Sequence, residues 1–318
     1  MTTPLDLFRA LSDPTRLRIV TLLRAMELSV GELAQVLGQS QPRVSRHVKI
    51  LCDAAICVRR REGSWVFLAP GDTELLAPLF VAIDHLLARS GGDPWAIADS
   101  ARLAAVRADR AAYAAQYFAT RAQDWDAIRS LHVSESAVEA KIASALATKR
   151  LGHLVDVGTG TGRMIALFGA QAEKAIGIDR SPEMLRLARA KLMDAGLESI
   201  DLRQGDINDL PLETGSADTV ILHQVLHYLP APESAIAELA RITAAHGHVL
   251  IVDFASHDRE ELRDKDAHAR LGFSDAQISG WFAASGLTCD LIDELPGDPL
   301  TVKIWRGTKT PAMQKDAQ

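Results

Sequence analysis

Three glycines at alternate positions follow a short apolar run near the middle of the chain. The run Leu154–Val157 leads into Gly158, Gly160 and Gly162, and a helical pattern comes next. Glycines at such a strand-to-helix turn let the backbone approach a ligand closely and adopt torsions that a side chain would forbid. Asp179 stands seventeen positions after Gly162, at the end of the next apolar run, where a carboxylate can accept both hydroxyls of a ribose. The spacing therefore predicts a nucleoside-binding turn.

The residues beside these glycines favour one kind of nucleoside over another. Dinucleotide-binding turns favour a third glycine one position further on, where this chain has Arg163. Asp156, two residues before the first glycine, would put negative charge near a pyrophosphate, whereas it suits a cationic amino-acid group. The turn thus favours a nucleoside that carries an amino acid.

A second group of reactive side chains follows a later apolar run, Thr219–Leu222. His223, His227 and Tyr228 come just after it, and either histidine could act as a general base. Hydrogen-bonded structural histidines are the alternative interpretation. If the runs are parallel strands, this group lies at the edge of the sheet where an acceptor would bind.

The elements that must position these residues are indicated by short β-branched runs. The runs Leu154–Val157, Ala175–Ile178, Thr219–Leu222 and His248–Val252 are separated by segments of helix length. This alternation predicts parallel strands with crossover helices, an α/β fold.

The first 70 residues have a different texture and a different charge. They hold ten Lys and Arg against six Asp and Glu, about +4 in a chain whose net charge is −6. Asp13-Pro14 begins a helix, Ser29–Leu37 forms another that Gly38 ends, and Ser40 caps a third over Gln41–Asp53. Two short helices joined by a glycine-containing turn predict a helix-turn-helix.

The second helix of this pair is amphipathic. Val44, Val48 and Leu51 recur at helical spacing and must face inward. The residues that face solvent can all donate hydrogen bonds to bases or phosphates. They are Gln41, Arg43, Ser45, Arg46 and Lys49. A hairpin follows over residues 56–68, which makes this a winged helix-turn-helix whose arginines lie near a DNA backbone. A solvated charged face is the alternative for such a helix alone.

The segments SQPRVSRHVKILCDAAI, VRRREGSWVFL and DPTRLRIVTLL resemble the winged-helix core of ArsR-type repressors over about residues 5–70. The resemblance implies a homodimer that binds a palindromic operator on double-stranded DNA, with recognition helices in successive major grooves. It also implies that Arg60 and Arg61 of the wing contact the DNA backbone. The residues that it implies in the major groove are Ser40, Gln41, Arg43, Ser45 and Arg46.

The metal-sensing members of that family carry a Cys-x-Cys pair in the first helix of the motif. The matching positions here are Ser29 and Gly31, which cannot form a thiolate site. Cys52 and Cys57 are predicted to be packing residues. We therefore expect no metal.

The glycine turn resembles the D-x-G-x-G-x-G motif of class I S-adenosylmethionine-dependent methyltransferases, which have a Rossmann-like fold. The segments 177–185, 204–207 and 218–227 match further motifs in the family's order, and the resemblance spans about residues 112–305. It implies S-adenosylmethionine or S-adenosylhomocysteine as the ligand.

The resemblance also implies a role for each residue of the ligand site. Asp179 would bind the ribose, Asp206 the adenine amino group, and Ile207 and Met184 the adenine ring. Gly158 and Gly160 would pass beneath the amino-acid part, and Asp156 would orient the loop and the ligand's ammonium. The expected set is completed by Gly162, Arg180 and His223. For Asp206, a turn-capping role is the alternative.

The chain of 318 residues, 47% hydrophobic and 24% charged, is predicted to be a globular protein of more than one domain. The expected division is a winged helix-turn-helix and dimerisation domain over 1–89, a linker and helical lid over 90–150 and a methyltransferase-like domain over 151–318. The lid would include Tyr117, Phe118 and Trp125, and ordinary core packing is the alternative interpretation of these aromatic side chains. No segment is apolar enough for a transmembrane helix, no signal peptide precedes the first domain, and three cysteines form no disulfide framework, so a cytoplasmic location is expected.

Two functions remain open. The segments 264–275 and 300–305 resemble fused ArsR-type/methyltransferase regulators that respond to S-adenosylmethionine or S-adenosylhomocysteine and control methionine-cycle genes. The alternative is an active small-molecule methyltransferase with an accessory DNA-binding domain, since in-line methyl transfer needs no special nucleophile. Arsenite is disfavoured as an acceptor because Cys289 is the only cysteine of the second half, and no signature of a DNA-base methyltransferase is present.

Overall fold

The computed structural model describes residues 3–62, 65–89, 95–121, 134–147, 150–197 and 200–310. The chain divides into two compact units, Met1–Ala112 and Tyr113–Gln318. The expected linker Ser90–Pro94 and the predicted lid residue Trp125 lie outside the described residues. Within the described part of the chain, every helix is too short or too polar to cross a lipid bilayer.

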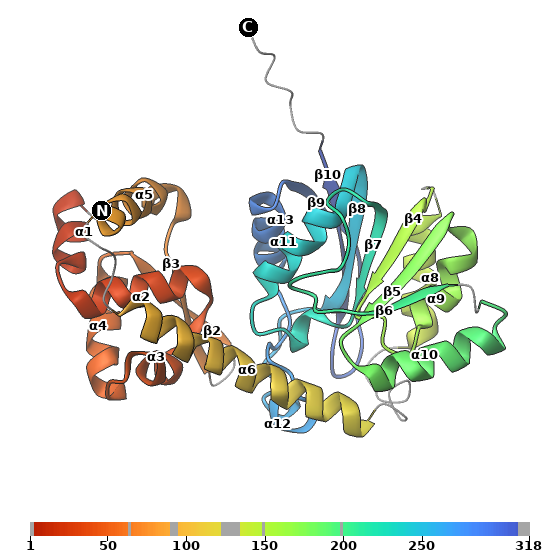
Figure 1. Cartoon of the computed structure of the whole chain (residues 1–318), viewed down its shortest axis with the longest axis horizontal. Coiled ribbons are helices and arrows are strands. Elements are labelled where there is room, and N and C mark those ends of the chain that lie inside the picture. The colour runs from red at the N-terminus through yellow and green to blue at the C-terminus, as the bar shows by residue number, and fades with distance from the viewer. Residues whose placement is uncertain are drawn as a thin grey trace, which may run out of the picture. The chain divides into compact units, whose positions relative to one another are not determined.

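The first unit is mainly helical and contains a small antiparallel sheet with the order β1-β3-β2 (Figure 1). Its elements are α1 (Pro4–Leu11), α2 (Pro14–Ala25), β1 (Leu28–Ser29), α3 (Val30–Leu37), α4 (Gln41–Asp53), β2 (Cys57–Glu62), β3 (Trp65–Pro70), α5 (Thr73–Arg89) and α6 (Ala96–Arg121). The last of these, α6, continues beyond Ala112 into the second unit.

Local sequence signals set the helix-turn-helix. The side chain of Asp13 accepts a hydrogen bond from the Arg16 backbone at the start of α2, and Ser29 and Glu32 form a capping box on α3. Gly38 ends α3 in the left-handed conformation, with φ 64°. The predicted inward residues of α4 are fully buried, so the amphipathic interpretation of that helix is confirmed.

The second unit is built on a seven-stranded sheet with the order β6-β5-β4-β7-β8-β10-β9, in which β10 is antiparallel to both neighbours. Its strands are β4 (His153–Val157), β5 (Lys174–Asp179), β6 (Asp201–Gln204), β7 (Ala217–His223), β8 (Thr243–Phe254), β9 (Leu287–Leu295) and β10 (Val302–Lys309). Its helices are α8 (Glu135–Leu146), α9 (Arg163–Phe168), η2 (Gly169–Gln171), α10 (Pro182–Asp194), η3 (Leu226–Tyr228), α11 (Pro232–Ile242), α12 (Glu261–Asp266) and α13 (Asp275–Ala284). The four predicted strands are all present and parallel, whereas β6, β9 and β10 were not predicted.

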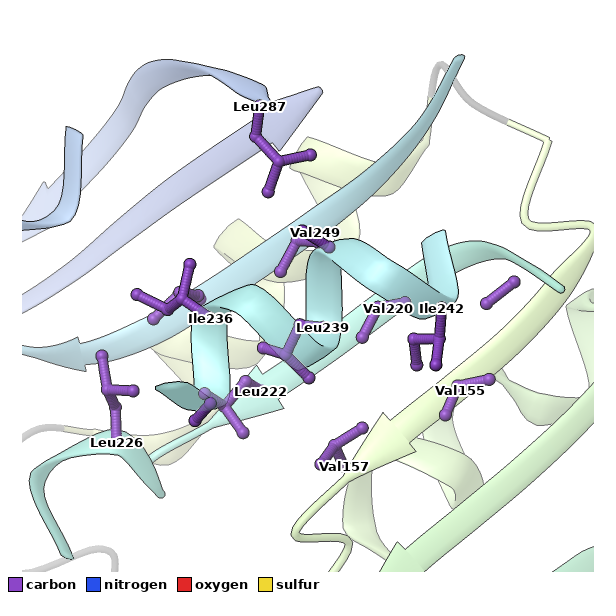
Figure 2. Close-up of a cluster of buried hydrophobic side chains, with 14 of the residues drawn as sticks. Val155, Val157, Val220, Leu222, Leu226, Ile236, Leu239, Ile242, Val249 and Leu287 are labelled. Atoms are coloured by element: carbon purple, nitrogen blue, oxygen red, sulfur yellow. The ribbon is translucent and has the colours of Figure 1, made fainter. Parts of the chain in front are cut away.

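Both faces of this sheet are covered, as expected when strands alternate with crossover helices. Val155 and Val157 belong to the core beneath α11 and α13, and Leu154 belongs to the opposite core with α8 and α9, because successive side chains of a strand point to opposite faces. Figure 2 shows Ile236 and Leu239 of α11 lying against side chains of β4, β7 and β8.

The strand order places a binding crevice. β5 lies on one side of β4 and β7 on the other, so the chain changes direction across the sheet between β4 and β7. The connections that follow these two strands therefore run in opposite directions across the sheet, and in open α/β sheets ligands bind at such a switch point. The predicted glycine turn follows β4, and the predicted histidines follow β7.

Candidate functional site

The glycine turn after β4 has the backbone that the sequence predicted. Gly158, Gly160 and Gly162 all have positive φ angles, of 68°, 53° and 84°, which side chains rarely adopt. The Thr159 backbone N–H donates to the Ile178 carbonyl at 2.9 Å, which joins the turn to the next strand. Gly162 is the N-cap of α9.

Packing as well as torsion requires glycine at the first position. A Cβ atom on Gly158 would lie 2.5 Å from Cγ2 of Val225, which belongs to the segment after β7. The two loops at the switch point are therefore in direct contact. The side chain of Val225 thus occupies the space that a side chain at position 158 would need.

Asp179 lies at the end of β5 and touches the glycine turn. Its carboxylate accepts hydrogen bonds from the backbone N–H groups of Gly160 and Ser181, both at 2.8 Å. Burial raises the pKa of Asp179, and the hydrogen bonds from the backbone oppose that rise. A carboxylate that is buried in this way is stabilised by additional hydrogen-bond donors, such as the hydroxyls of a ribose. Asp179 therefore fits the ribose of an adenosyl ligand.

The other predicted ligand residues divide into three groups. Asp156 is buried and accepts a hydrogen bond from the Thr159 hydroxyl at 2.6 Å, a contact that orients the loop. Met184 is buried with Tyr228 and Ala267, and Phe118 packs against this cluster. Ile207 is half-buried and Arg180 is exposed.

Asp206 is exposed and caps its own turn. Its carboxylate accepts from the backbone and side-chain N–H groups of Asn208 at 2.9 and 3.0 Å. The turn-capping interpretation therefore describes the structure, and adenine recognition by this residue remains a prediction.

The predicted histidines are both buried, and one has a partner that the sequence did not reveal. His223 is the last residue of β7 and lies opposite Val252 in register. His227, in η3, has Nδ1 at 2.8 Å from Oδ1 of Asp253, near the end of β8. The two residues are 26 positions apart, on different elements, so no short motif connects them. An acid near the end of a strand adjacent to β7 is the one signal that could have suggested the pair.

Further rings surround His227. Its ring centroid lies 4.0 Å from that of Tyr228, 4.3 Å from that of His268 and 4.9 Å from that of Phe254. Burial lowers the pKa of His257, a neighbour of Phe254 and His268, to about 4. His257 is therefore neutral at neutral pH, and sequence analysis did not single it out.

The predicted DNA-contacting residues of α4 lie together on one exposed face. Ser40 occupies the N-cap position, and the remaining five follow along the helix. They are Gln41, Arg43, Ser45, Arg46 and Lys49. Lys49 forms an ion pair with Asp53 at 2.9 Å, and its ammonium would have to leave that carboxylate to contact a phosphate.

The two predicted wing arginines differ in their surroundings. Arg61 is exposed, whereas Nη1 of Arg60 lies 2.5 Å from Oε1 of the buried Glu27. Arg60 therefore stabilises the wing on the helical core. Arg59, which was not in the predicted set, is also exposed on β2.

The two cysteines of the first unit are in contact with each other. The Sγ atoms of Cys52, at the end of α4, and Cys57, at the start of β2, lie 3.2 Å apart. Cys57 is buried and Cys52 is half-buried, which agrees with packing roles. Among the described residues, no group of three or more His, Cys, Asp and Glu side chains could hold a metal ion.

Helix α6 is anchored in the first unit by its N-terminal half. Arg18 of α2 makes a bidentate ion pair with Asp99, with both contacts at 2.7 Å and both side chains buried. Arg102 and Arg107 of α6 donate to the carbonyls of Val36 and Ala25. The same helix, beyond the unit boundary, contributes Phe118, whose ring centroid lies 4.7 Å from that of Tyr228.

Comparison with known proteins assigns one family to each unit. Residues 13–56 match the family described as bacterial regulatory protein, arsR family, and residues 155–251 match a methyltransferase domain. The phosphatidylethanolamine N-methyltransferase of Cereibacter sphaeroides is 33% identical over 159 residues, which are 47% of this chain and 76% of that protein. The arsenical resistance operon repressor of Escherichia coli is 45% identical over 64 residues, 20% of this chain and 55% of that protein.

The matches to the repressors are partial. This chain spans 55% of the Escherichia coli repressor and 59% of the arsenic resistance regulator ArsR2 of Pseudomonas putida. Among solved structures, the YcgJ protein of Bacillus subtilis has a TM-score of 0.48 and 18% identity, covering 55% of this chain and 100% of that one.

Proposed function

This chain belongs to two families, with an ArsR-family helix-turn-helix domain at its N-terminus and a methyltransferase domain behind it, and we propose that it is a transcriptional regulator with an adenosyl effector. The effector would be S-adenosylmethionine or S-adenosylhomocysteine, held by the glycine turn and Asp179. Both compounds belong to the methionine cycle, so we propose genes of that cycle as the targets.

DNA binding by a homodimer is supported by the surface of the first unit. The exposed polar face of α4 offers several hydrogen-bond donors of the kinds that contact base edges in a major groove. Large apolar side chains are exposed on α1 and α5, the two helices that pack on α2 through Arg16 and Arg24. They are Leu5, Phe8, Val81 and Leu86. A second copy would cover these side chains, and a two-fold dimer would match a palindromic operator.

One observation carries the proposal that the two domains communicate. The boundary between the compact units lies inside α6, a single helix over Ala96–Arg121. Its first half holds the buried pair with Arg18 beside the helix-turn-helix, and its second half places Phe118 on the cluster of Met184 and Tyr228. A ligand that packs against Met184 would change the contacts of Phe118, and α6 would connect that change to the DNA-binding domain. Such a coupling would connect two distinct sites, the ligand site and the DNA-binding helix, through α6.

The test measures both affinities and their dependence on each other. Isothermal titration of the full chain with each adenosyl compound gives the ligand affinity. A duplex selected from a random-sequence pool by the ligand-free protein then serves as DNA, and fluorescence anisotropy gives its affinity with and without each compound. We expect the DNA dissociation constant to change at least about 5-fold with one of them.

Two variants give the controls. Phe118→Ala should leave ligand-free DNA binding unchanged and reduce the effect of the ligand on it. Leu86→Asp should shift the chain toward monomer in analytical ultracentrifugation and weaken DNA binding. Equal DNA affinity with and without a bound ligand would contradict the proposed effector role.

A further inference from the structure

A carboxylate with several donors fixes His227 at the carboxyl edge of the sheet. Oδ1 of Asp253 accepts hydrogen bonds from His227 Nδ1 at 2.8 Å and from the Phe254 backbone at 2.7 Å, and its Oδ2 accepts from the His227 backbone at 3.3 Å. Asp253 is fully buried. A carboxylate at Nδ1 selects the tautomer in which Nδ1 carries the proton and Nε2 holds a lone pair.

In this tautomer the second ring nitrogen of His227, Nε2, can accept a proton. Its Nε2 is buried and has no hydrogen-bond partner among the described residues. Buried polar atoms usually have partners, and an exception calls for an explanation such as a catalytic role or a bound water. The backbone of His227 is held in place by its neighbour Leu226 in the core and by the Arg270 backbone N–H, which donates to the His227 carbonyl at 2.9 Å.

This pair lies beside the turn that we propose for the adenosyl ligand. Val225, two residues before His227, is the residue that approaches Gly158. Tyr228, the next residue, packs with Met184. Val225 and Tyr228, on either side of His227 along the chain, therefore both contact residues of the proposed ligand site.

We propose that His227 is the general base of a methyl-transfer reaction, with Asp253 as its positioning residue. The acceptor would carry a proton on its nucleophilic atom at neutral pH, as hydroxyls, thiols and ammonium groups do. The proposal rests on the adenosyl site proposed above and adds an activity to it, so that the regulator also consumes S-adenosylmethionine.

The reaction balances without any further reagent. The acceptor's proton moves to His227 Nε2, and the acceptor's electron pair forms the bond to the methyl carbon. The methyl–sulfur bond breaks with its electron pair on sulfur, which changes the sulfonium into a neutral thioether. The imidazolium is stabilised by the Asp253 carboxylate and afterwards releases its proton to water.

His257, in the same region, is less suited to the role. His257 has a pKa of about 4 because of burial, and its Nδ1 accepts from the Arg259 backbone at 3.2 Å. His227, by contrast, has a ring nitrogen in contact with a buried carboxylate.

The first test does not depend on turnover. Long-range ¹H–¹⁵N spectra of the full chain labelled with ¹⁵N-histidine report the tautomer of each ring, and the His227 signals are identified by their loss in His227→Gln. We expect an Nδ1–H tautomer in the wild type and a weaker preference for that tautomer in Asp253→Asn, which keeps the size of the side chain and removes its charge. A wild-type ring with the proton on Nε2 would overturn the proposal.

The second test measures formation of S-adenosylhomocysteine with phenol, 2-mercaptoethanol and ethanolamine as acceptors, and with pyridine as an acceptor that carries no proton at pH 7.5. We expect turnover of at least one protonated acceptor, a fall of about 100-fold in kcat in both variants, and unchanged binding of S-adenosylhomocysteine. His246→Asn, at an exposed histidine of β8, is the matched control and should behave as the wild type.

Three outcomes separate the two proposals. Ligand binding without turnover of any acceptor overturns the catalytic proposal and leaves the effector role intact. Equal losses with pyridine and with the protonated acceptors also overturn it, because a base is not needed for pyridine. Failure of the wild type to bind either adenosyl compound would instead overturn the proposed function.

Discussion

The two units of this chain place their candidate site residues in opposite surroundings. In the helix-turn-helix, the polar residues of α4 are exposed, and the apolar residues beneath them form the core. In the methyltransferase domain, Asp156, His227 and Asp253 are buried, and their hydrogen bonds run to the protein's own backbone and side chains. In the first unit, the candidate recognition residues and the residues that stabilise the fold are therefore different. In the second unit, the same residues belong to both groups.

This difference predicts how the two sites respond to substitution. An exposed side chain can be removed at little cost to folding, since surface substitutions usually change stability by less than about 0.5 kcal/mol. A buried polar group leaves its partner unsatisfied when it is removed. Variants of the first site should therefore affect DNA binding alone, and variants of the second should affect the function of the site and folding together.

The largest effect is expected at the glycine turn. Gly158→Ala combines a positive φ with a Cβ atom 2.5 Å from Val225, whereas Gly196→Ala has a similar φ of 69° and no atom within 4 Å. We expect about 3 kcal/mol of destabilisation for the first and about 1 kcal/mol for the second. Thermal unfolding followed by circular dichroism measures both. Similar melting temperatures for the two variants would show that the contact with Val225 is relieved at no cost.

Asp179→Ala should have the next largest effect, on ligand binding. Loss of a charged acceptor is expected to weaken adenosyl binding about 30-fold and to leave DNA binding unchanged. The variant also frees the Gly160 N–H, so a small fall in melting temperature should accompany it. Titration calorimetry gives the affinity. Wild-type affinity for both adenosyl compounds would place the ligand elsewhere.

Arg46→Ala tests the exposed site and should have a moderate effect. Loss of one groove contact is expected to weaken DNA binding about 10-fold, with an unchanged melting temperature and unchanged ligand affinity. Lys49→Ala is a useful comparison, because its ammonium is already paired with Asp53 and should contribute less. Anisotropy at a fixed salt concentration measures both. A lower melting temperature for Arg46→Ala would contradict the separation of recognition from stability in this unit.

The same contrast explains what could be predicted from the sequence. Helical periodicity separates Val44 and Val48 from the exposed residues of α4, because a local pattern decides both burial and exposure. The alternate glycines after Val157 predict a turn with positive φ angles for the same reason, since the torsions are properties of single residues.

The features that were missed depend on contacts between distant segments. The interest of Asp253 lies in its contact with His227, and that contact forms only because β7 and β8 are neighbours in the sheet. The pairing of Arg60 with Glu27 likewise joins the wing to the loop after α2. β10 was not predicted because an antiparallel strand breaks the alternation on which the strand assignments were based.

The smallest effect concerns Cys52, a half-buried residue of the unit whose site is otherwise exposed. The hydrogen bond from Cys57 lowers the pKa of the Cys52 thiol to about 7. A lowered pKa means that the reactive thiolate is present above pH 7 and is lost below it, so alkylation by iodoacetamide should reach half its maximal rate near pH 7, as mass spectrometry of the modified peptide can measure. Cys57→Ala removes the donor and should move this midpoint up toward about 8.5, with little change in DNA binding. If the midpoint stayed the same in that variant, the contact between the two sulfur atoms would not be the cause of the lowered pKa of Cys52.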